Sequence, residues 1–516
     1  MLKYIFFPTT RDVWRDLAVH LYRQDIASPV IWIGHRCHDQ FAREEFQSCN
    51  VINFNDVNKG VIGKQAFSQR CTGPALKILR EPWFSEFKDQ TLRMFDRKDY
   101  FGAFRMIDRE AVFYRLVFSF YSLIEKERPD FLLMAESPHS AATFVVYRIC
   151  EYLNIPVIGF MSCSVAPALF IKSGIDKPIL KLTSQKKQDS FKKSATSAID
   201  QMIINFSPEN HKPQQPRYML NQRRKERGRK FGRPLKMLRD VARALLNPLL
   251  PGFMRARTYS AFHGFSAFGN NPGPISEILK FVTEIKSQRM LIQSCTEKSI
   301  SESEFPSDYA FFPLHYEPER TSNPDGGEWN NQYHALARLR QLLPQDVAIV
   351  VKEHPSQLGS VLQGFRGRSR LFYEAISTLE NTFFAQVDIP SWKIQQNALF
   401  TCTITGTAAL EAAISGKPSL LMGHPWFQGC PGITQISEST TIEDIVNNTA
   451  TKEEVRSFLY RLINEYSIFG VVNPSNERYF SMWFQDGQAR SIEAEGIKDF
   501  TLLAIDFLVA GKHEKK

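Results

Sequence analysis

The sequence lacks the features of several large protein classes. It contains no stretch that approaches the roughly 20 uninterrupted apolar residues needed to span a membrane. The apolar run at residues 2–8 is too short for a signal peptide. The eight cysteines form no Cys-x-x-Cys pair, and several lie in apolar runs, where cysteine behaves as a small buried hydrophobe. We therefore expect a reduced, cytoplasmic protein that does not cross the membrane.

Motifs for metals and nucleic acids are also missing. There is no Asp-x-Asp, the motif by which many transferases hold a divalent ion on a nucleotide diphosphate. His35, Cys37, His38 and Asp39 lie close together, but their spacing matches no usual structural zinc pattern. No basic motif interleaved with aromatic residues indicates nucleic-acid binding. The sequence predicts a reaction that needs no metal and no cofactor.

The composition is that of a globular protein with more than one domain. The 516 residues exceed one ordinary core, and 43% are hydrophobic and 23% charged. The net charge of +10 is local. Residues 212–257 hold fourteen Lys and Arg against Glu226 and Asp240, a net charge of +12, so the rest of the chain is nearly neutral. An anionic partner should be sought at this segment.

Two regions alternate apolar runs with helical patterns, as parallel α/β sheets do. In the first region, strands are predicted at residues 4–7, 30–34, 131–135 and 156–160, and helices at 12–23, 114–126 and 141–153. In the second, strands are predicted at residues 309–314, 347–351, 382–386, 399–405 and 419–422, and helices at 330–343, 389–398 and 408–415. The predicted fold class is α/β, with two Rossmann-like domains facing each other across a cleft and a basic helical connector. The expected divisions are residues 1–183 (first domain), 184–305 (connector), 306–440 (second domain) and 441–516 (C-terminal helices folding back on the first domain).

The turn after the predicted strand that contains Thr403 and Thr405 has the features of a phosphate site. Gly406 allows close approach of the backbone, Thr407 supplies a hydroxyl, and the following helix offers N–H groups at its positive end. Thr403 and Thr405 alternate along the strand and can share a face. Glu411, about one turn beyond Thr407, is placed to reach a ribose hydroxyl. The alternative is that Thr407 only caps the helix.

Glu353-His354-Pro355 ends the neighbouring predicted strand, so its side chains are expected in the same crevice. Pro355 prevents a helix from starting immediately. His354 can donate to a phosphate or carboxylate oxygen, unless it only satisfies a loop carbonyl. With the Thr405–Thr407 turn, this motif predicts a nucleotide-phosphate site.

Several motifs follow one another as in a known family. They are Phe312-Pro313-Leu314-His315-Tyr316-Glu317-Pro318-Glu319, Glu353-His354-Pro355, Thr405-Gly406-Thr407-Ala408-Ala409-Leu410-Glu411-Ala412-Ala413, Gly416-Lys417-Pro418 and Gly423-His424-Pro425-Trp426-Phe427. Through them, residues 309–427 resemble the capsule polysaccharide biosynthesis proteins, two-domain (GT-B) glycosyltransferases related to bacterial Kdo- and sialyltransferases. The first domain resembles them only in outline, through Glu136-Ser137-Pro138-His139. The resemblance implies that His354-Pro355 and the Thr405/Thr407 pair bind the nucleotide phosphate, and that the donor is a CMP-activated acidic sugar.

Such an enzyme needs a base to deprotonate the acceptor hydroxyl, or a carboxylate nucleophile. Glu136, at the end of the predicted strand 131–135, is the leading candidate, and His139, at a helix start, can accept a proton or orient it. The alternative is a capping cluster in which Ser137 caps the helix, Pro138 occupies its first turn and His139 is solvated.

His315, Glu317 and Glu319 follow another strand end and are candidates for contacts with the donor sugar. Their alternative role is to bridge the domains. Arg11 and Asp12 are weaker candidates for lining the cleft.

Residues 223–250 combine a basic run with apolar positions at helical spacing. Such a helix can lie on the anionic inner surface of the cytoplasmic membrane, or it can pack its apolar face into the protein. Both interpretations remain open.

The leading hypothesis is a glycosyltransferase of capsule or other surface-polysaccharide biosynthesis. Its partners would be a nucleotide-sugar, a glycan or lipid-linked glycan acceptor, and the membrane surface, with no nucleic acid. One alternative is a phosphotransferase that uses a CDP-activated polyol donor. Another is a glycan-binding accessory protein that has lost the chemistry.

Overall fold

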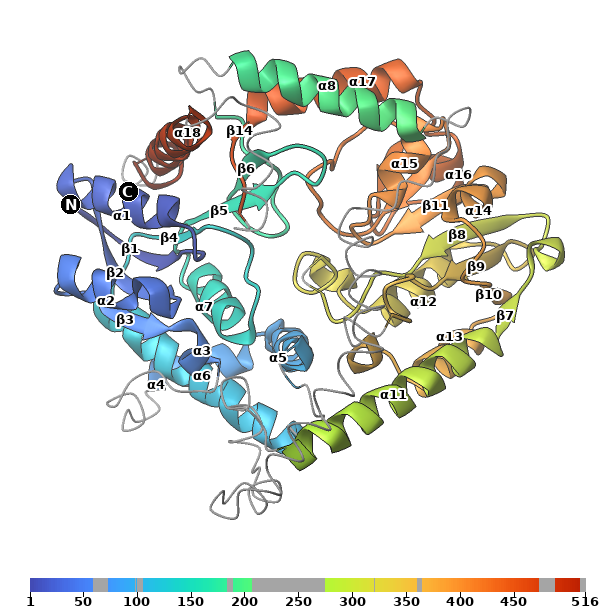
Figure 1. Ribbon diagram of the computed structural model, residues 1–516, viewed down its shortest axis with the longest axis horizontal. Coiled ribbons are helices and arrows are strands. Elements are labelled where there is room, and N and C mark those ends of the chain that lie inside the picture. Colours follow the sequence, from blue (N-terminus) through green and yellow to red (C-terminus); the bar gives the residue numbers. More distant parts are fainter. Residues whose placement is uncertain are drawn as a thin grey trace.

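The computed structural model shows two α/β halves, each built on one sheet (Figure 1). The described residues are 1–58, 73–97, 99, 105–182, 189–206, 274–319, 321–359, 364–472 and 488–510. The basic segment predicted at residues 223–250 lies outside them.

The first sheet has seven strands in the order β14-β6-β5-β4-β1-β2-β3. Their bounds are β1 Leu2–Phe7, β2 Ala27–Gly34, β3 Asn50–Asn53, β4 Phe131–Met134, β5 Val157–Ser162, β6 Ala168–Lys172 and β14 Ile468–Phe469. Strands β1 to β5 are parallel, whereas β6 runs antiparallel to both β5 and β14. Because β1 pairs with both β2 and β4, the strand order reverses between β1 and β4, which is where such sheets open a crevice at their carboxyl ends.

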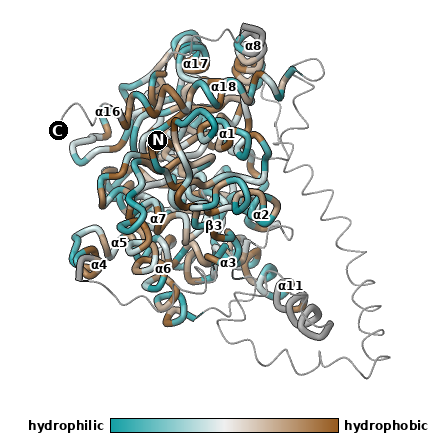
Figure 2. Tube along the Cα trace, turned by 90° about the vertical axis from the view of Figure 1, so that its left-hand side faces the viewer, coloured by the Kyte–Doolittle hydropathy of each residue, from teal (hydrophilic) through white to brown (hydrophobic). Residues whose placement is uncertain are grey.

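Helices cover both faces of this sheet, which explains why its strands are apolar without interruption. Along β1, Tyr4 and Phe6 pack into one core, and Ile5 and Phe7 into another. The helices of this half are α1 Asp12–Arg23, α2 Arg36–Glu45, α3 Phe54–Val57, α4 Gly73–Lys77, α5 Phe84–Met94, α6 Met106–Glu127, α7 Ala141–Tyr152 and α18 Gln488–Ile505. The surface helices alternate between hydrophilic and hydrophobic residues along their turns (Figure 2). In α1 the buried residues recur at helical spacing, at Trp14, Leu17, Ala18 and Leu21.

The second sheet is parallel throughout, in the order β13-β12-β11-β8-β9-β10-β7. Its strands are β7 Ser299–Ile300, β8 Tyr309–Pro313, β9 Ala348–Lys352, β10 Thr382–Ala385, β11 Phe400–Thr403, β12 Ser419–Leu421 and β13 Ile433–Gln435. Its helices are α11 Pro274–Thr296, α12 Gln332–Leu342, α13 Arg370–Ser377, α14 Ser391–Asn397, α15 Ala408–Ile414 and α16 Ile442–Val446. Apart from β7 at the edge, this is the Rossmann order, with its reversal between β8 and β11. The predicted α/β class with two Rossmann-like units is confirmed.

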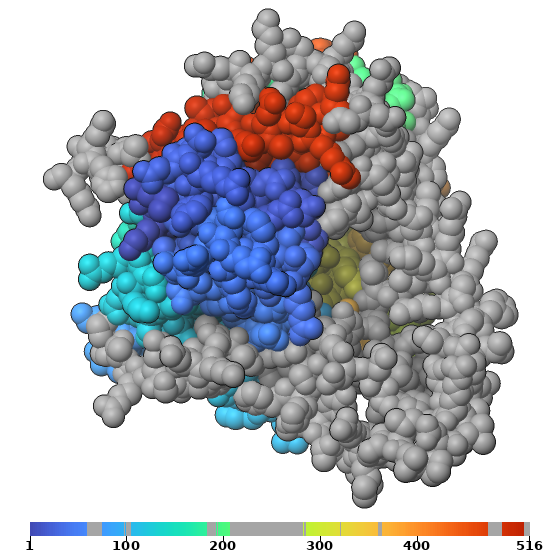
Figure 3. Space-filling model, turned by 60° about the vertical axis from the view of Figure 1, so that its left-hand side comes forward, coloured from blue at the N-terminus to red at the C-terminus, as the bar shows by residue number. Residues whose placement is uncertain are grey.

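The two halves are joined by helices and by the returning C-terminal part of the chain. α8 (Asp189–Phe206) and α17 (Lys452–Tyr466) pack together at the top of Figure 1, and α17 contacts both β6 and α15. The chain then adds β14 to the first sheet and lays α18 on α1, as the red helix on the blue surface of Figure 3 shows. Arg11, a weak candidate for the cleft, is buried here, and its Nη1 donates to Glu493 Oε1 of α18 at 2.6 Å. Its role is to dock α18.

Two elements of the range assigned to the connector, residues 184–305, pack with the second half. β7 pairs with β10, and α11 packs against α13 with Leu291 and Cys295 in the core of this half. α11 packs there because burying its apolar side chains in this core is favourable. None of the helices in the described ranges has the length and apolar character needed to cross a membrane.

Candidate functional site

The carboxyl ends of β8 and β11 bring the first pair of predicted residues together. His315 follows β8 and Thr403 ends β11, and His315 Nε2 lies 3.1 Å from Thr403 Oγ1. The backbone N–H of Thr405 donates to the same nitrogen at 3.3 Å. These contacts lie where the strand order reverses, which is where doubly wound sheets bind ligands.

His315 is a neutral imidazole that links β8 to β11. Burial, with His354 and Arg368 nearby, lowers its pKa to about 3. Because Nε2 accepts the Thr405 N–H, the ring proton is on Nδ1. The His315 carbonyl accepts from Arg368 Nη2 at 2.7 Å and from Gln332 Nε2 at 3.2 Å. The residue is therefore held from both sides.

The loop after β9 changes the role expected of Glu353. This residue is 1% exposed, and its carboxylate accepts from Arg368 Nε at 3.0 Å and from the Tyr373 hydroxyl at 2.8 Å. It also accepts from the N–H of His354 at 2.7 Å. Contrary to the sequence prediction, the carboxylate is not placed to contact a nucleotide. It fixes the loop because its charge is balanced inside the protein by Arg368.

His354, the next residue, keeps a donor for a ligand. It is half-buried, and burial lowers its pKa to about 4. Its Nδ1 accepts from the N–H of Ser356 at 3.2 Å, so the proton of the neutral ring is on Nε2. No described residue accepts from this N–H. The ring lies next to that of Tyr316, with centroids 6.2 Å apart, and Pro355 beside it is exposed.

The turn at Thr405 and Gly406 is packed tightly against the same cluster. A Cβ at Gly406 would come within 2.7 Å of Thr403 Oγ1, so the glycine permits the close approach. The N–H of Gly406 donates to Thr403 Oγ1 at 3.2 Å. The Thr405 hydroxyl donates to the carbonyl of Thr321 at 2.6 Å, so it orders the loop after β8.

Thr407 is the residue before α15, but its hydroxyl makes no capping bond. It donates instead to Glu411 Oε1 at 3.1 Å, and burial raises the pKa of the Glu411 carboxyl. A ribose contact by Glu411, as predicted, would have to compete with this bond.

Glu317 and Glu319 lie where the two halves meet. Glu317 lines a pocket with an empty volume of about 620 Å³. First-half residues lining it are Arg93, Asp96 and Arg97, and second-half residues include Asn331, Gln332 and Arg368. Glu317 Oε1 accepts from Gln332 Nε2 at 3.0 Å, and the Glu319 carbonyl accepts from Arg97 at 2.8 Å.

The structure places Glu136 and His139 at the reversal point of the first sheet. Glu136 is half-buried two residues beyond β4, and His139 is exposed. The residue that caps α7 is Ser140, which forms a capping box with Thr143. The capping alternative therefore assigned that role to the wrong serine, because α7 begins at Ala141, where the helix was predicted, and Ser140 is the residue directly before it.

Arg97 is a functional candidate that the sequence did not reveal. It ends the short helix η3 (Phe95–Arg97) of the first half and is buried. Its guanidinium donates to the His139 carbonyl at 3.0 Å and, across the cleft, to the carbonyls of Glu319 and Asn323. One side chain thus ties the loop after β4 to the loop after β8. These partners are distant in sequence and carry no motif.

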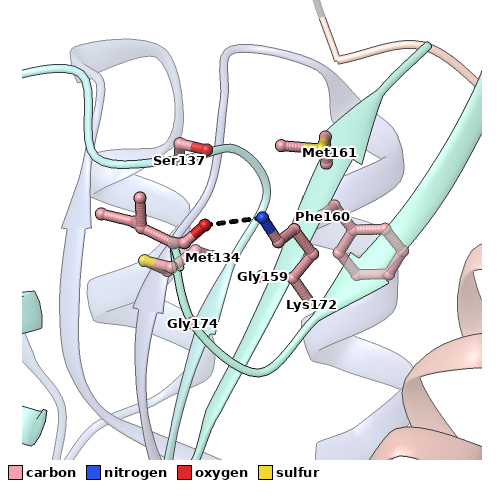
Figure 4. Close-up of a pocket in the computed structure, with 8 residues that line it drawn as sticks. Met134, Ser137, Gly159, Phe160, Met161, Lys172 and Gly174 are labelled. Atoms are coloured by element: carbon pink, nitrogen blue, oxygen red, sulfur yellow. Dashed lines mark hydrogen bonds between the residues drawn. The ribbon is translucent and has the colours of Figure 1, made fainter. Parts of the chain in front are cut away.

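Lys172 is a second residue that the sequence did not reveal. It ends β6, is 4% exposed, and lines a small pocket with Ser137 and Gly159 (Figure 4). Its ammonium donates to the carbonyl of Ile175 at 2.6 Å and to that of His424, in the second half, at 3.1 Å. A lysine that closes an otherwise apolar strand was the available signal.

Within the described ranges, no three or more His, Cys, Asp or Glu side chains are arranged to hold a metal ion. In the group at residues 35–39, His38 Nε2 lies 3.1 Å from Asp12 Oδ1, and Asp39 accepts from Asn53 at 2.6 Å.

Residues 279–469 match the model of the capsule polysaccharide biosynthesis protein family. The resemblance to this family is confirmed. The matched segment runs from α11 to β14 and contains the loops after β8, β9 and β11 that meet at the reversal point. No curated protein matches the chain.

The chain is only weakly similar to solved structures. The chain is similar to Thermosulfurimonas dismutans KpsC, a beta Kdo 2,7 transferase, at 14% identity and a TM-score of 0.27, over 69% of this chain and 83% of that one. It is similar to the UDP-GlcNAc 2-epimerase of Methanocaldococcus jannaschii at 11% identity and a TM-score of 0.21, over 93% and 99% of the two chains. These scores are too low to bear on the architecture or the reaction. The strand orders carry the architecture.

Proposed function

We propose that the protein is a glycosyltransferase of capsule or other surface-polysaccharide biosynthesis. It would transfer a sugar from a nucleotide-activated donor to a glycan or a lipid-linked glycan. The family match supports the biosynthetic role. The observation that supports the chemistry is that both sheets present polar residues at their reversal points, and Arg97 connects the two loops.

On the donor side, His354 would contribute its Nε2–H to a phosphate oxygen of the nucleotide. The contact needs no change in protonation, because the pKa of about 4 keeps the ring neutral near pH 7. The loop that carries His354 is fixed by the buried Glu353 carboxylate. For the Thr405–Thr407 turn to complete the site, the hydroxyls of Thr405 and Thr407 would exchange their bonds to the Thr321 carbonyl and to Glu411 for bonds to the phosphate. In line with the family resemblance, the proposed donor is a CMP-linked acidic sugar of the Kdo or sialic-acid type.

On the acceptor side, Glu136 would take the proton of the attacking hydroxyl. The acceptor oxygen then bonds to the anomeric carbon, and the bond from that carbon to the nucleotide phosphate breaks. His139, exposed on the same loop, would orient the acceptor or relay the proton. No step in this scheme requires a metal ion.

A donor screen tests the proposal. Full-length protein is incubated with CMP-, CDP- and UDP-activated compounds and a glycan acceptor, and nucleotide release and product mass are measured. Release of the nucleotide with a sugar added to the acceptor supports it. A product that retains a phosphate would identify a polyol phosphotransferase instead. A chain that binds none of the nucleotides would indicate an accessory protein.

Membrane association is a separate part of the proposal. It rests on the basic segment at residues 223–250, which lies outside the described residues. Deleting residues 223–230 should reduce co-sedimentation with anionic liposomes, and unchanged sedimentation would remove this part alone.

A further inference from the structure

Lys172 is a buried cation that has Asp176 and Asp325 nearby but, within the described residues, no carboxylate in contact. Its side chain is 4% exposed, and its two partners are the neutral carbonyls of Ile175 and His424. In the part of the chain that the structure describes, no carboxylate forms an ion pair with it. Burying an unpaired ammonium is unfavourable, and proteins normally avoid it or pair it. A cation kept in this state therefore points to a ligand.

A small pocket adjoins this ammonium. Met134, Gly159 and Lys172 lie side by side on β4, β5 and β6. The pocket is open on one side, has room for about one water-sized group such as a single ligand oxygen, and is also lined by Ser137, the residue after Glu136 (Figure 4). Lys172 thus lies beside the loop that carries the proposed base.

The same ammonium is also next to the donor side. It reaches the carbonyl of His424, and the preceding Gly423 packs on the proposed phosphate turn. A Cβ at Gly423 would come within 2.7 Å of Thr405 Cγ2. Lys172 therefore stands between the loop after β4 and the turn after β11.

In the described part of the donor side, the basic groups beside the His354 loop are neutral or already bonded within the protein. His315 and His354 are neutral near pH 7 because burial lowers their pKa values to about 3 and 4. Arg368 is paired with Glu353, and Lys352 donates to the carbonyl of Val387 at 3.2 Å. An anionic group bound in a partly buried cleft is stabilised by a nearby positive charge. Lys172 is placed to supply it from the first half.

We propose that Lys172 binds an anionic oxygen of the substrates, a phosphate or a sugar carboxylate, between β6 and the turn after β11. The inference rests on the proposed function and adds a residue of the first half to the donor site. Ligand binding would then bring a negative charge into direct contact with the ammonium.

The test uses three variants of the full-length protein. Lys172→Met removes the charge and keeps the stem, and Lys172→Arg keeps the charge. Lys177→Met, at an exposed lysine of the neighbouring loop, is the matched control. Affinities for inorganic phosphate, CMP and glucuronate are measured by calorimetry, together with the melting temperature.

We expect Lys172→Met to weaken at least one anion about tenfold or more, and Lys177→Met to change none of them more than about twofold. Loss confined to phosphate and CMP assigns the phosphate, and loss confined to glucuronate assigns the sugar carboxylate. The melting temperature of Lys172→Met should stay equal or rise, because an unpaired buried charge is removed. Unchanged affinity for all three probes in Lys172→Met would overturn the proposal, as would a lower melting temperature with full affinity, which marks a purely structural lysine.

If Lys172→Met does not fold, the wild-type protein still decides. Burial lowers the pKa of Lys172 to about 8, and the groups that face it are Asp176 and Lys177 of its own half and Asp325 and His424 of the other. Inorganic phosphate stays dianionic between about pH 7.5 and 9.5, and His424 is neutral there because burial lowers its pKa. Phosphate affinity should therefore fall as the pH rises through 8, and a flat profile overturns the proposal. Anion binding without any donor turnover would remove the glycosyltransferase assignment and leave this site standing.

Discussion

The loops at the reversal points of the two sheets occupy equivalent positions but are built differently. In the second half, His315, Glu353 and Thr403 are locked into one network with Arg368 and the backbone of the turn. In the first half, Glu136 is half-buried and His139 exposed on a short connection to α7. In the proposed assignment, the donor side is held by its own network, whereas the acceptor loop carries one half-buried and one exposed polar side chain. Contacts from Arg97 set the distance between them.

The largest expected effect concerns the open side. Glu136→Gln should lower the rate of transfer about 10²–10⁴-fold, because a positioned general base contributes that much. Donor affinity should remain within about twofold, since Glu136 is not among the residues proposed to contact the donor. The rate is measured with saturating donor, and Glu125→Gln, an exposed glutamate on α6, serves as the control. A fully active Glu136→Gln variant would remove this residue as the base.

The second prediction concerns the locked side. Glu353→Gln leaves the buried Arg368 without its partner and should lower the free energy of unfolding by about 3–5 kcal/mol. Glu374→Gln breaks an exposed pair with Arg370 and should change it by at most about 1 kcal/mol. Chemical denaturation measures both. Equal, small effects would show that the buried pair of Glu353 and Arg368 does not lock this side.

Arg97→Met tests the connection between the loops after β4 and β8. It should lower the free energy of unfolding by about 1.5–3 kcal/mol for each hydrogen bond lost, because these bonds involve a charged group. Transfer should fall with donor affinity unchanged, because the loops are no longer held together. Arg456→Met, which removes a half-exposed pair with Asp200, is the control. If Arg97→Met loses donor binding instead, the donor side is not independent of the first half.

His354→Ala should weaken nucleotide binding about tenfold to a hundredfold, the range for one hydrogen bond to a charged oxygen. The fold should be retained, since no described residue accepts from its Nε2–H. Calorimetry with the preferred nucleotide measures the loss, and His334→Ala on α12, an exposed histidine, should bind normally. Equal affinities for the two variants would place the nucleotide elsewhere.

The last prediction concerns the effect of pH on stability. The pKa values of His315 and His354, about 3 and 4, lie below the unfolded value near 6.5. Between pH 6.5 and the folded pKa of each histidine, the ring binds a proton in the unfolded chain but not in the folded protein. Each histidine should therefore lower the free energy of unfolding by about 1.4 kcal/mol per pH unit as the pH falls through this range. Unfolding curves at pH 7 and 5 measure this slope. His315→Gln should reduce it, and an unchanged slope would contradict the assigned protonation.

Much of the fold was predictable from local signals. The helix at residues 12–23 and the strand starting at Thr382 were predicted at the positions that α1 and β10 occupy, because amphipathic spacing and apolar runs are properties of short segments. β14 was not predictable, since a two-residue strand has no pattern. The C-terminal helices were expected to fold back on the first domain, but the sequence did not indicate that α18 would pack on α1. The bond between Arg11 and Glu493 joins residues from opposite ends of the chain.

The site divides in the same way. The sequence placed His354 and the Thr405–Gly406–Thr407 turn at neighbouring strand ends, and parallel strands direct such ends to one edge. It could not tell that Glu353 points inward, because its partner Arg368 lies on a separate loop. The sequence also could not identify Lys172 as a candidate site residue. A lysine at the end of a strand is unusual only when its surroundings are known to be buried.

By itself, the sequence determined the α/β class, the two Rossmann-like units and the loops that carry polar chemistry. These follow from periodicity and from residues next to one another in the chain. The tertiary structure alone decided which charged groups are paired, which are left for a ligand, and which residues join the two halves. Those properties depend on contacts between distant segments and on exclusion of water, and neither is encoded within a short stretch of sequence.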